Sequence, residues 1–98
     1  MKLIFDWDES KARHNRTTHK VSFDEAKTVF NDPFLVTFPD DFHSHEEDRF
    51  ISIGNSSKNR IILIIHTEDN EDSGTVIRFI SARKATPSER KTYEKRKN

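Results

Sequence analysis

Apolar residues recur along the 98-residue chain with two different periods, which predicts a mixture of strands and helices. Short segments rich in β-branched and aromatic residues are separated by polar turns. They predict five strands, at Lys2–Trp7, Phe34–Phe38, Arg49–Gly54, Arg60–Thr67 and Thr75–Arg83. The fourth segment is apolar on both of its faces, so we expect it at the centre of the sheet.

Three further segments are predicted to be helices. They span Asp8–His19, Ser22–Phe30 and Pro87–Lys97. Asp8 is the candidate N-cap of the first helix. Ser22 and Glu25 have the spacing of a capping box, as do Thr86 and Glu89 before the last helix. The order β-α-α-β-β-β-β-α predicts a single α+β domain over residues 1–98, an antiparallel sheet with helices packed mainly on one face.

Composition narrows the class of protein. Hydrophobic residues make up 32% of the chain and charged residues 35%, which predicts a small core. The absence of cysteine excludes a disulfide framework and a thiolate zinc site. No apolar run approaches the ~20 residues of a membrane span, and the acidic N-terminal segment does not resemble a signal peptide. We therefore expect a cytoplasmic protein with no membrane partner.

Charge is balanced in total but unevenly distributed. The chain has 17 basic and 17 acidic side chains, yet residues 1–50 hold 7 basic and 11 acidic ones. From Thr75 to the end there are 8 basic and 2 acidic side chains. Such a basic segment attracts phosphate groups, although a solvated, lysine-rich helix accounts for the same pattern.

The strand Thr75–Arg83 carries the most suggestive charges. Arg78, Ser81 and Arg83 lead into a helix N-terminus, an arrangement that suits an anion such as a phosphodiester. Regular alternation places Arg78 and Arg83 on opposite faces of the strand. They can bind one anion together only if a bulge near Ser81 redirects the chain. The alternative is that these arginines form ion pairs with the acidic loops.

Histidines supply the candidate acid–base groups. His66 lies on an apolar face of the central strand, where a histidine is more often structural; beside Arg83 it would be placed to exchange protons. His19, between the first two helices, is more consistent with packing or capping. His43 and His45 sit among acidic residues and include metal-ligand types. A solvated acidic loop is the preferred interpretation, and neither a metal nor another cofactor is predicted.

The single tryptophan, Trp7, allows two interpretations. It stands in a segment with strand-like alternation, close to Phe5, so its ring is expected to pack in the core. An exposed indole would instead offer a stacking surface for a nucleobase. The core position is the preferred interpretation.

Four segments carry a resemblance to a known family. They are FDWDESKARHN at Phe5–Asn15, HKVSFDEAKTVFNDP at His19–Pro33, EDRFISIG at Glu47–Gly54 and IRFISARKATPSERKTYE at Ile77–Glu94. In this order they resemble the BrnT family, the toxins of BrnT/BrnA type II toxin–antitoxin systems. The last string is the most specific. The resemblance implies a RelE-like fold and a metal-independent ribonuclease that inhibits translation by cleaving RNA.

The same resemblance implies partners. Toxins of this kind are neutralised by a BrnA-like antitoxin that carries a ribbon-helix-helix DNA-binding domain. The complex represses its own operon, so DNA would be contacted only through the antitoxin. RNA would be the substrate of the toxin itself.

The resemblance also marks individual positions. The matching residues are Lys11, His19, Arg49, Arg78, Ser81, Arg83 and Lys84. Two departures stand out. Where the family often reads TER after the central strand, this chain has Asp69 in place of the arginine, and His66 stands where the family often has tyrosine. The exchange of an arginine for an acid puts full activity in doubt.

The resulting hypothesis assigns the scissile phosphate to Arg83, assisted by Arg78 or Lys84, because guanidinium groups hold phosphate oxygens well. The other candidates are Ser81 in the catalytic site, His66 or His19 for acid–base catalysis, and Lys11, Lys84, Arg49 and Trp7 for RNA contacts. Asp69 supports two alternatives. One is a catalytically weakened homologue that serves as an antitoxin-binding module. The other is a small protein that binds nucleic acid without cleaving it.

Overall fold

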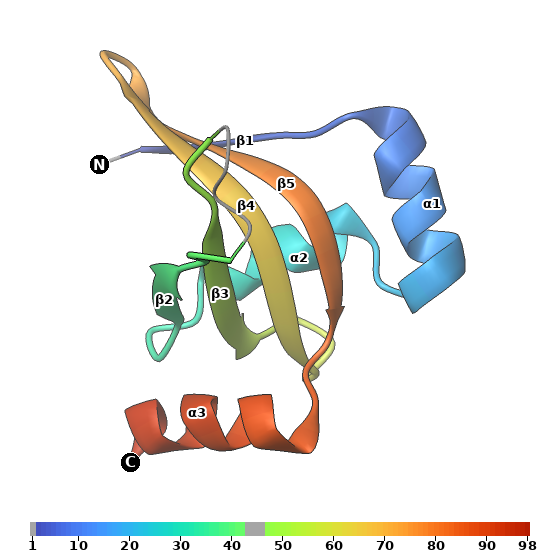
Figure 1. Cartoon of the computed structure of the whole chain (residues 1–98), viewed down its shortest axis with the longest axis vertical. Coiled ribbons are helices and arrows are strands. Elements are labelled where there is room, and N and C mark those ends of the chain that lie inside the picture. Colours follow the sequence, from blue (N-terminus) through green and yellow to red (C-terminus); the bar gives the residue numbers. More distant parts are fainter. Residues whose placement is uncertain (1, 43–46) are drawn as a thin grey trace.

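The computed structural model describes residues 2–42 and 47–98. Its strands are β1 (Leu3–Asp6), β2 (Val36–Pro39), β3 (Phe50–Asn55), β4 (Ile61–Glu71) and β5 (Gly74–Lys84), and its helices are α1 (Glu9–His19), α2 (Phe23–Val29) and α3 (Pro87–Lys97). The predicted element order and the α+β class are confirmed (Figure 1). Within the described ranges, no helix is long and apolar enough to cross a membrane.

The strands form one sheet in the order β1-β5-β4-β3-β2, with β4 at its centre as predicted. Three neighbouring pairs are antiparallel, but β1 runs parallel to β5, from Leu3 opposite Thr75 to Asp6 opposite Arg78. The predicted antiparallel sheet is therefore wrong at this edge. The first and last strands are joined by no hairpin turn, so no local connection fixes their relative direction.

Strands β4 and β5 are longer than the sequence predicts. The polar segment from Glu68 to Gly74 was expected to be a turn, yet its ladder continues to the pair Glu71–Gly74. Only Asp72 and Ser73 form the turn itself. Backbone pairing needs no apolar side chains, so β4 continues past the end of β3 beside β5, and the tip of this hairpin projects beyond β1 (Figure 1).

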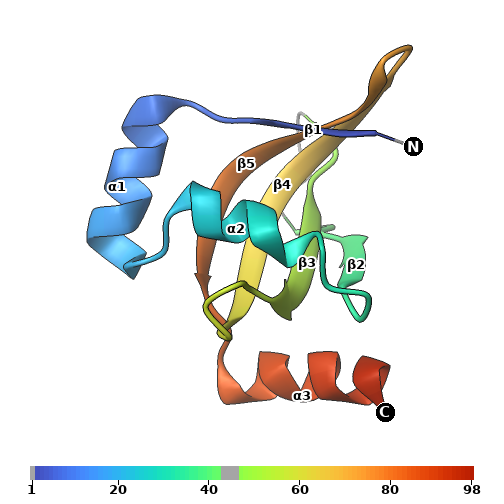
Figure 2. The same cartoon turned by 180° about the vertical axis from the view of Figure 1, so that it is seen from behind.

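The main core lies on the face of the sheet that carries Ile62 and Ile64, here called the inner face. Residues from α1, α2, β4 and β5 are buried there, among them Phe23, Val29 and Phe79. Figure 2 shows α2 lying across this face, with α1 beside β5. Two of the three helices thus cover one face, as the apolar spacing predicts.

The opposite, outer face carries Leu63 and Ile65. Helix α3 lies across one end of the sheet (Figure 1), where Tyr93 packs against Ile53 and Leu63. The Tyr93 hydroxyl donates a 2.6 Å hydrogen bond to Asp32 Oδ2, which anchors the helix. The remaining outer face has half-buried apolar residues such as Ile65 and no helix over it.

The helix caps are partly as predicted. Asp8 caps α1, and Thr86 and Glu89 form a complete capping box at α3. Ser22 caps α2 by accepting the Glu25 N–H at 3.0 Å, but the reciprocal half of that box is missing. The Glu25 carboxylate is instead buried, and it binds Arg60 and the Ser56 hydroxyl. Compensating a buried charge took precedence over the local cap.

Candidate functional site

A β-bulge interrupts β5 at Ile80. Ser81 pairs with Ile65 on β4, whereas Phe79 pairs with the next β4 residue, His66, so Ile80 is left over. An extra residue of this kind bends the strand and shifts the alternation of faces beyond it. The bulge near Ser81, which is the condition for the two arginines to bind one anion together, is therefore present.

The bulge places the two arginines of β5 on one face. Before it, Ile77 and Phe79 are buried on the inner face and Arg78 is exposed on the outer one. Beyond it, Ala82 is buried on the inner face, so Arg83 belongs to the outer one. Regular alternation predicted opposite faces for Arg78 and Arg83, and the bulge corrects this prediction.

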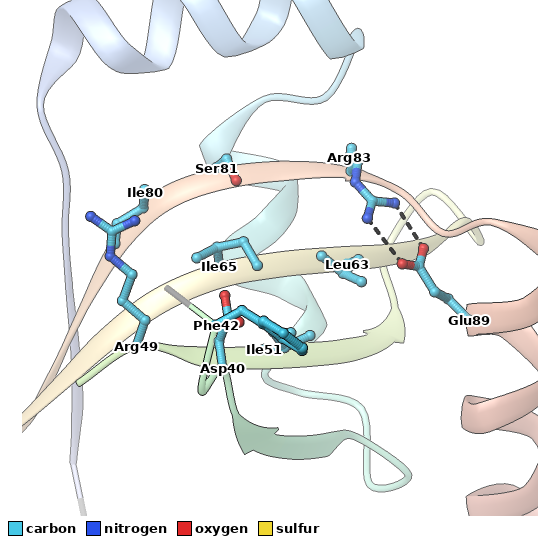
Figure 3. A pocket seen from close by; sticks show the side chains of 10 residues that line it. All are labelled: Asp40, Phe42, Arg49, Ile51, Leu63, Ile65, Ile80, Ser81, Arg83 and Glu89. Carbon is cyan, nitrogen blue, oxygen red and sulfur yellow. Dashed lines mark hydrogen bonds and ion pairs between the residues drawn. The ribbon is translucent and has the colours of Figure 1, made fainter. Parts of the chain in front are cut away.

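A hollow of about 490 Å³ opens on the outer face (Figure 3). Its floor consists of apolar side chains from three neighbouring strands, including Ile51, Ile65 and Ile80. Arg49 stands at one end of this floor and Arg83 at the other. The shape offers an apolar surface between two cations.

A smaller hollow of about 180 Å³ adjoins the first, because Arg49 and Ile80 line both. It brings Arg78 of β5 together with Lys11 of α1 and with Arg49, three residues that are far apart in the sequence. Carboxylates of Asp8 and Glu47 line the same hollow, so the cations face some compensating charge. We call the two hollows together the outer groove.

Arg83 is held by the last helix. Its two terminal nitrogens donate to the two Glu89 carboxylate oxygens at 2.8 and 2.9 Å, and the same carboxylate accepts the Thr86 N–H. The Arg83 guanidinium lowers the pKa of Glu89 to about 2, and Glu89 in turn raises the pKa of Arg83. The ion pair considered from the sequence exists, but its acid comes from α3 and not from a loop.

Arg78 is the more accessible of the two arginines. Its side chain is 60% exposed, and its Nε lies 3.8 Å from Asp6 Oδ2. An ion pair between exposed groups at this distance contributes little, typically 0–1 kcal/mol. Arg78 can therefore turn toward an anionic ligand at small cost.

His66 occupies a different environment from the one an acid–base residue needs. Its side chain is 0% exposed on the inner face, with Nε2 2.7 Å from the Ser52 hydroxyl oxygen. Burial lowers the pKa of His66 to about 4, and the rings of Phe30 and Phe50 lie beside it. Since the outer groove is on the other side of the sheet, the structure does not bring His66 beside Arg83, as the predicted acid–base role required.

Three other candidates lie outside the outer groove. His19 is the half-buried last residue of α1, and Lys84 is exposed at the end of β5. Trp7 packs against Phe23 and Phe79, with ring centroids 5.9 and 5.7 Å away. These contacts confirm the core interpretation of Trp7 and argue against its use as a stacking surface for a base.

Asn15 is important for the site but was not predicted. Its side chain amide donates to the carbonyl of Ala82, and its oxygen accepts the Ala82 N–H, at 2.8 and 3.1 Å. Strand β1 pairs only with the first part of β5, as far as Arg78. At Ala82, next to Arg83, the Asn15 side chain makes the backbone hydrogen bonds that a neighbouring strand would otherwise make. The sequence signal was weak: Ala12 and Asn15 share one face of an otherwise polar helix.

Metal ligation was considered from the sequence for the segment around His43 and His45. These two residues lie outside the described part of the chain. Within residues 2–42 and 47–98, no group of three or more histidine, cysteine, aspartate and glutamate side chains is arranged to hold a metal ion.

Comparisons with known proteins identify the family. Residues 7–89 match the model of the family described as "Ribonuclease toxin, BrnT, of type II toxin-antitoxin system". A crystal structure of the Brucella abortus ribonuclease toxin BrnT has a similar fold, with a TM-score of 0.60 and 24% identity over 88% of this chain and 99% of that one. No curated protein matches. Because the family model spans most of the sequence, including both β5 arginines, the chain belongs to the BrnT family of ribonuclease toxins of type II toxin–antitoxin systems.

Proposed function

We propose that this protein is a metal-independent endoribonuclease that inhibits translation, and that RNA is cleaved in the outer groove. The observation that carries the proposal is the bulge at Ile80, which places both β5 arginines on the apolar floor that Lys11 of α1 and Arg49, just before β3, also border. Cleavage without a metal can use the ribose 2′-hydroxyl as nucleophile. The protein then has to position the phosphate and stabilise the charge that develops on it.

The outer groove provides groups for both tasks. Arg78, Lys11 and Arg49 would bind phosphate oxygens, because charge-assisted hydrogen bonds to phosphate are strong. The apolar floor, including Ile65 and Ile80, would take a nucleobase beside them. This assignment gives the leading phosphate role to Arg78, the more exposed of the two arginines.

Arg83 retains a role in this proposal. A guanidinium has five N–H donors, and Glu89 accepts from only two of its nitrogens. The ion pair with α3 fixes the orientation of Arg83 at the end of the floor, so its remaining donors are preorganised for a second phosphate. Ser81, at the edge of the same hollow, offers a hydroxyl nearby.

Proton transfer needs groups other than His66. Four carboxylates line the outer groove, of which Asp8 caps α1 and Glu89 pairs with Arg83. We therefore assign the acceptance of the 2′-hydroxyl proton to Asp40 and Glu47. General acid–base assistance contributes about 10²–10⁴-fold. Loss of Asp40 or Glu47 should therefore leave a slower but active enzyme.

The family membership also supports the partners. A BrnA-like ribbon-helix-helix antitoxin would neutralise the toxin, and DNA would be bound only by that antitoxin. The substrate RNA and the ribosomes are in the cytoplasm, which is where this toxin would act.

The test is cleavage of a defined RNA by purified protein in excess EDTA. Wild type should cleave, and Arg78→Gln should be slower by about 100-fold, the usual cost of losing one donor to the transition state. Arg13→Gln is the matched control, because Arg13 is an exposed α1 arginine outside the groove. Equal rates for Arg78→Gln and the control, or complete inhibition by EDTA, would contradict the proposal.

A weakened toxin that serves as an antitoxin-binding module is the second candidate. Thr67 pairs with Arg78, and Asp69 lies two residues farther along β4, so alternation places its carboxylate on the outer face. A negative charge there repels RNA phosphates. Induction in cells separates the candidates: growth arrest with loss of RNA supports the toxin, and unimpaired growth supports the module.

A further inference from the structure

A second hollow, of about 500 Å³, lies between α3 and the turn that joins β3 to β4. Four cationic side chains line it, Arg60, Lys84, Arg90 and Lys97. Among its described lining residues there is no aspartate or glutamate. We call it the end hollow, because α3 crosses the end of the sheet there (Figure 1).

Most of this charge is not compensated within the fold. Arg60 is paired with the buried carboxylate of Glu25 through Nε at 2.9 Å, so its charge is largely balanced. For Lys84 and Arg90 the described residues provide no ion pair. Lys97 lies over an aromatic ring 6.0 Å away and makes no ion pair with a described carboxylate. Three cations therefore face an open space without an acid paired to them in the described part of the chain.

Hydrogen bonds hold the turn and the tyrosine ring that border the end hollow. The turn residue Asn59 accepts a 3.2 Å hydrogen bond from the Asn55 side chain amide. Tyr93 is fixed by its hydrogen bond to Asp32, whose carboxylate also accepts the Asn55 N–H at 2.8 Å. Asp32 attracts Lys97, but its Oδ2 accepts from Tyr93 and Asn55, and its Oδ1 accepts from the Phe34 N–H. A ligand in the end hollow would therefore order the exposed cationic side chains but not the turn and the ring around them.

We propose that the end hollow binds the phosphate backbone of the RNA outside the cleavage site. The two sites adjoin at the junction of β5 and α3. Arg83 and Glu89 line the outer groove, while their neighbours Lys84 and Arg90 line the end hollow. An RNA strand that leaves the outer groove past Arg83 would therefore next meet the cations of the end hollow. Lys84 is one of them, so its RNA contact belongs to this second site. That the ligand of the end hollow is RNA rests on the proposed function.

The chemistry of the lining favours nucleic acid over an acidic peptide. Its polar groups are mainly ammonium, guanidinium and amide donors, which match phosphate oxygens. Its apolar part is small, Ile61 and Ala85 beside the Tyr93 ring, and gives a peptide side chain little to anchor on. Recognition of single-stranded RNA without sequence preference commonly uses such a basic surface.

The test compares two triple variants. One removes the uncompensated cations of the end hollow, Lys84→Gln/Arg90→Gln/Lys97→Gln. The control removes the same charge from exposed α3 positions that do not line it, Lys91→Gln/Lys95→Gln/Arg96→Gln. The probe is a 2′-O-methyl RNA of about twelve nucleotides, within the range of single-strand sites, which cannot be cleaved through a 2′-hydroxyl. Circular dichroism and thermal unfolding confirm that both variants fold.

The hollow variant should bind this RNA at least tenfold more weakly than wild type, and the control less than threefold. The magnitude of its slope of log affinity against log salt should fall by about 2, because three phosphate contacts are lost and each contributes about 0.7 for a single strand. Equal losses in both variants would overturn the inference. The inference would also be overturned if the hollow variant bound RNA as wild type does but lost its binding to a poly-glutamate peptide. Absence of cleavage by wild type contradicts the proposed function instead, because the binding assay requires no cleavage.

Discussion

Protonation of His66 should destabilise the fold as the pH falls. The side chain is 0% exposed and its pKa is lowered by burial from 6.5 to about 4, whereas the unfolded chain titrates near 6.5. Between these values the unfolded state binds the proton and the folded state does not. The contribution of neutral His66 to stability is therefore complete above pH 6.5 and is lost as the pH falls toward 4.

The magnitude follows from this difference in pKa. One pKa unit corresponds to 1.36 kcal/mol, so a shift from 6.5 to about 4 gives a full loss of about 3 kcal/mol. Between pH 8 and pH 5 the loss is about 2 kcal/mol. Glu68, whose carboxylate is 3.9 Å from His66 Nδ1, would offset a small part once the ring is charged. For a domain of this size such a loss is a large part of the total stability.

Urea denaturation at pH 8 and pH 5 measures this effect. The wild type should lose about 2 kcal/mol more between the two pH values than His66→Gln, which has no titrating ring. The other histidines and carboxylates are common to both proteins, so their contributions cancel in the difference. Equal losses for the two proteins, or an NMR titration of His66 near pH 6.5 in the folded state, would refute the reasoning.

Three further substitutions test other parts of the structure. Asp69→Arg removes a carboxylate from the outer face and adds a cation, so single-turnover RNA cleavage should become several-fold faster; a slower rate would contradict the role given to Asp69. Asn15→Ala leaves the N–H and C=O of Ala82 without their partner and should lower the free energy of unfolding in urea by about 2–4 kcal/mol. Glu89→Gln should lower the thermal midpoint at pH 7 by several degrees, since it weakens the α3 cap and the pair with Arg83. The pKa of Glu89 is depressed to about 2, so the wild type loses this advantage as the pH falls from about 4.5 to 2, and the two midpoints should converge there.

The sequence predicted best those features that depend on nearby residues. The caps at Asp8 and Thr86 and the central position of β4 were correct, because hydroxyl or carboxylate caps and continuous apolar runs are local signals. The parallel pairing of β1 was not predictable in this way, since it depends on how both ends of the chain meet. The same holds for Glu25, whose carboxylate binds Arg60, 35 residues away, and does not complete its local cap.

The site was predictable in its residue types more than in its geometry. The position of Arg78 beside Lys11 and Arg49 could be expected only from the family resemblance, because it depends on the packing of α1 against β5. His66 was misplaced for a physical reason. A central strand is apolar on both faces, so its sequence does not tell which face of the sheet receives the histidine.

The bulge at Ile80 also bears on how the chain selects its register during folding. Without it, the ladder that starts at the β4–β5 turn would continue in step and place Arg83 opposite Ile62. In the native register that position is held by Lys84, whose side chain is exposed at the end of the strand. The slipped pairing would also place Ser81 opposite Ile64, which is 0% exposed, and would move Ala82 to the outer face. A hydroxyl buried without a partner costs roughly 1–3 kcal/mol. Ser81, which lines the groove in the native state, therefore also disfavours the competing pairing.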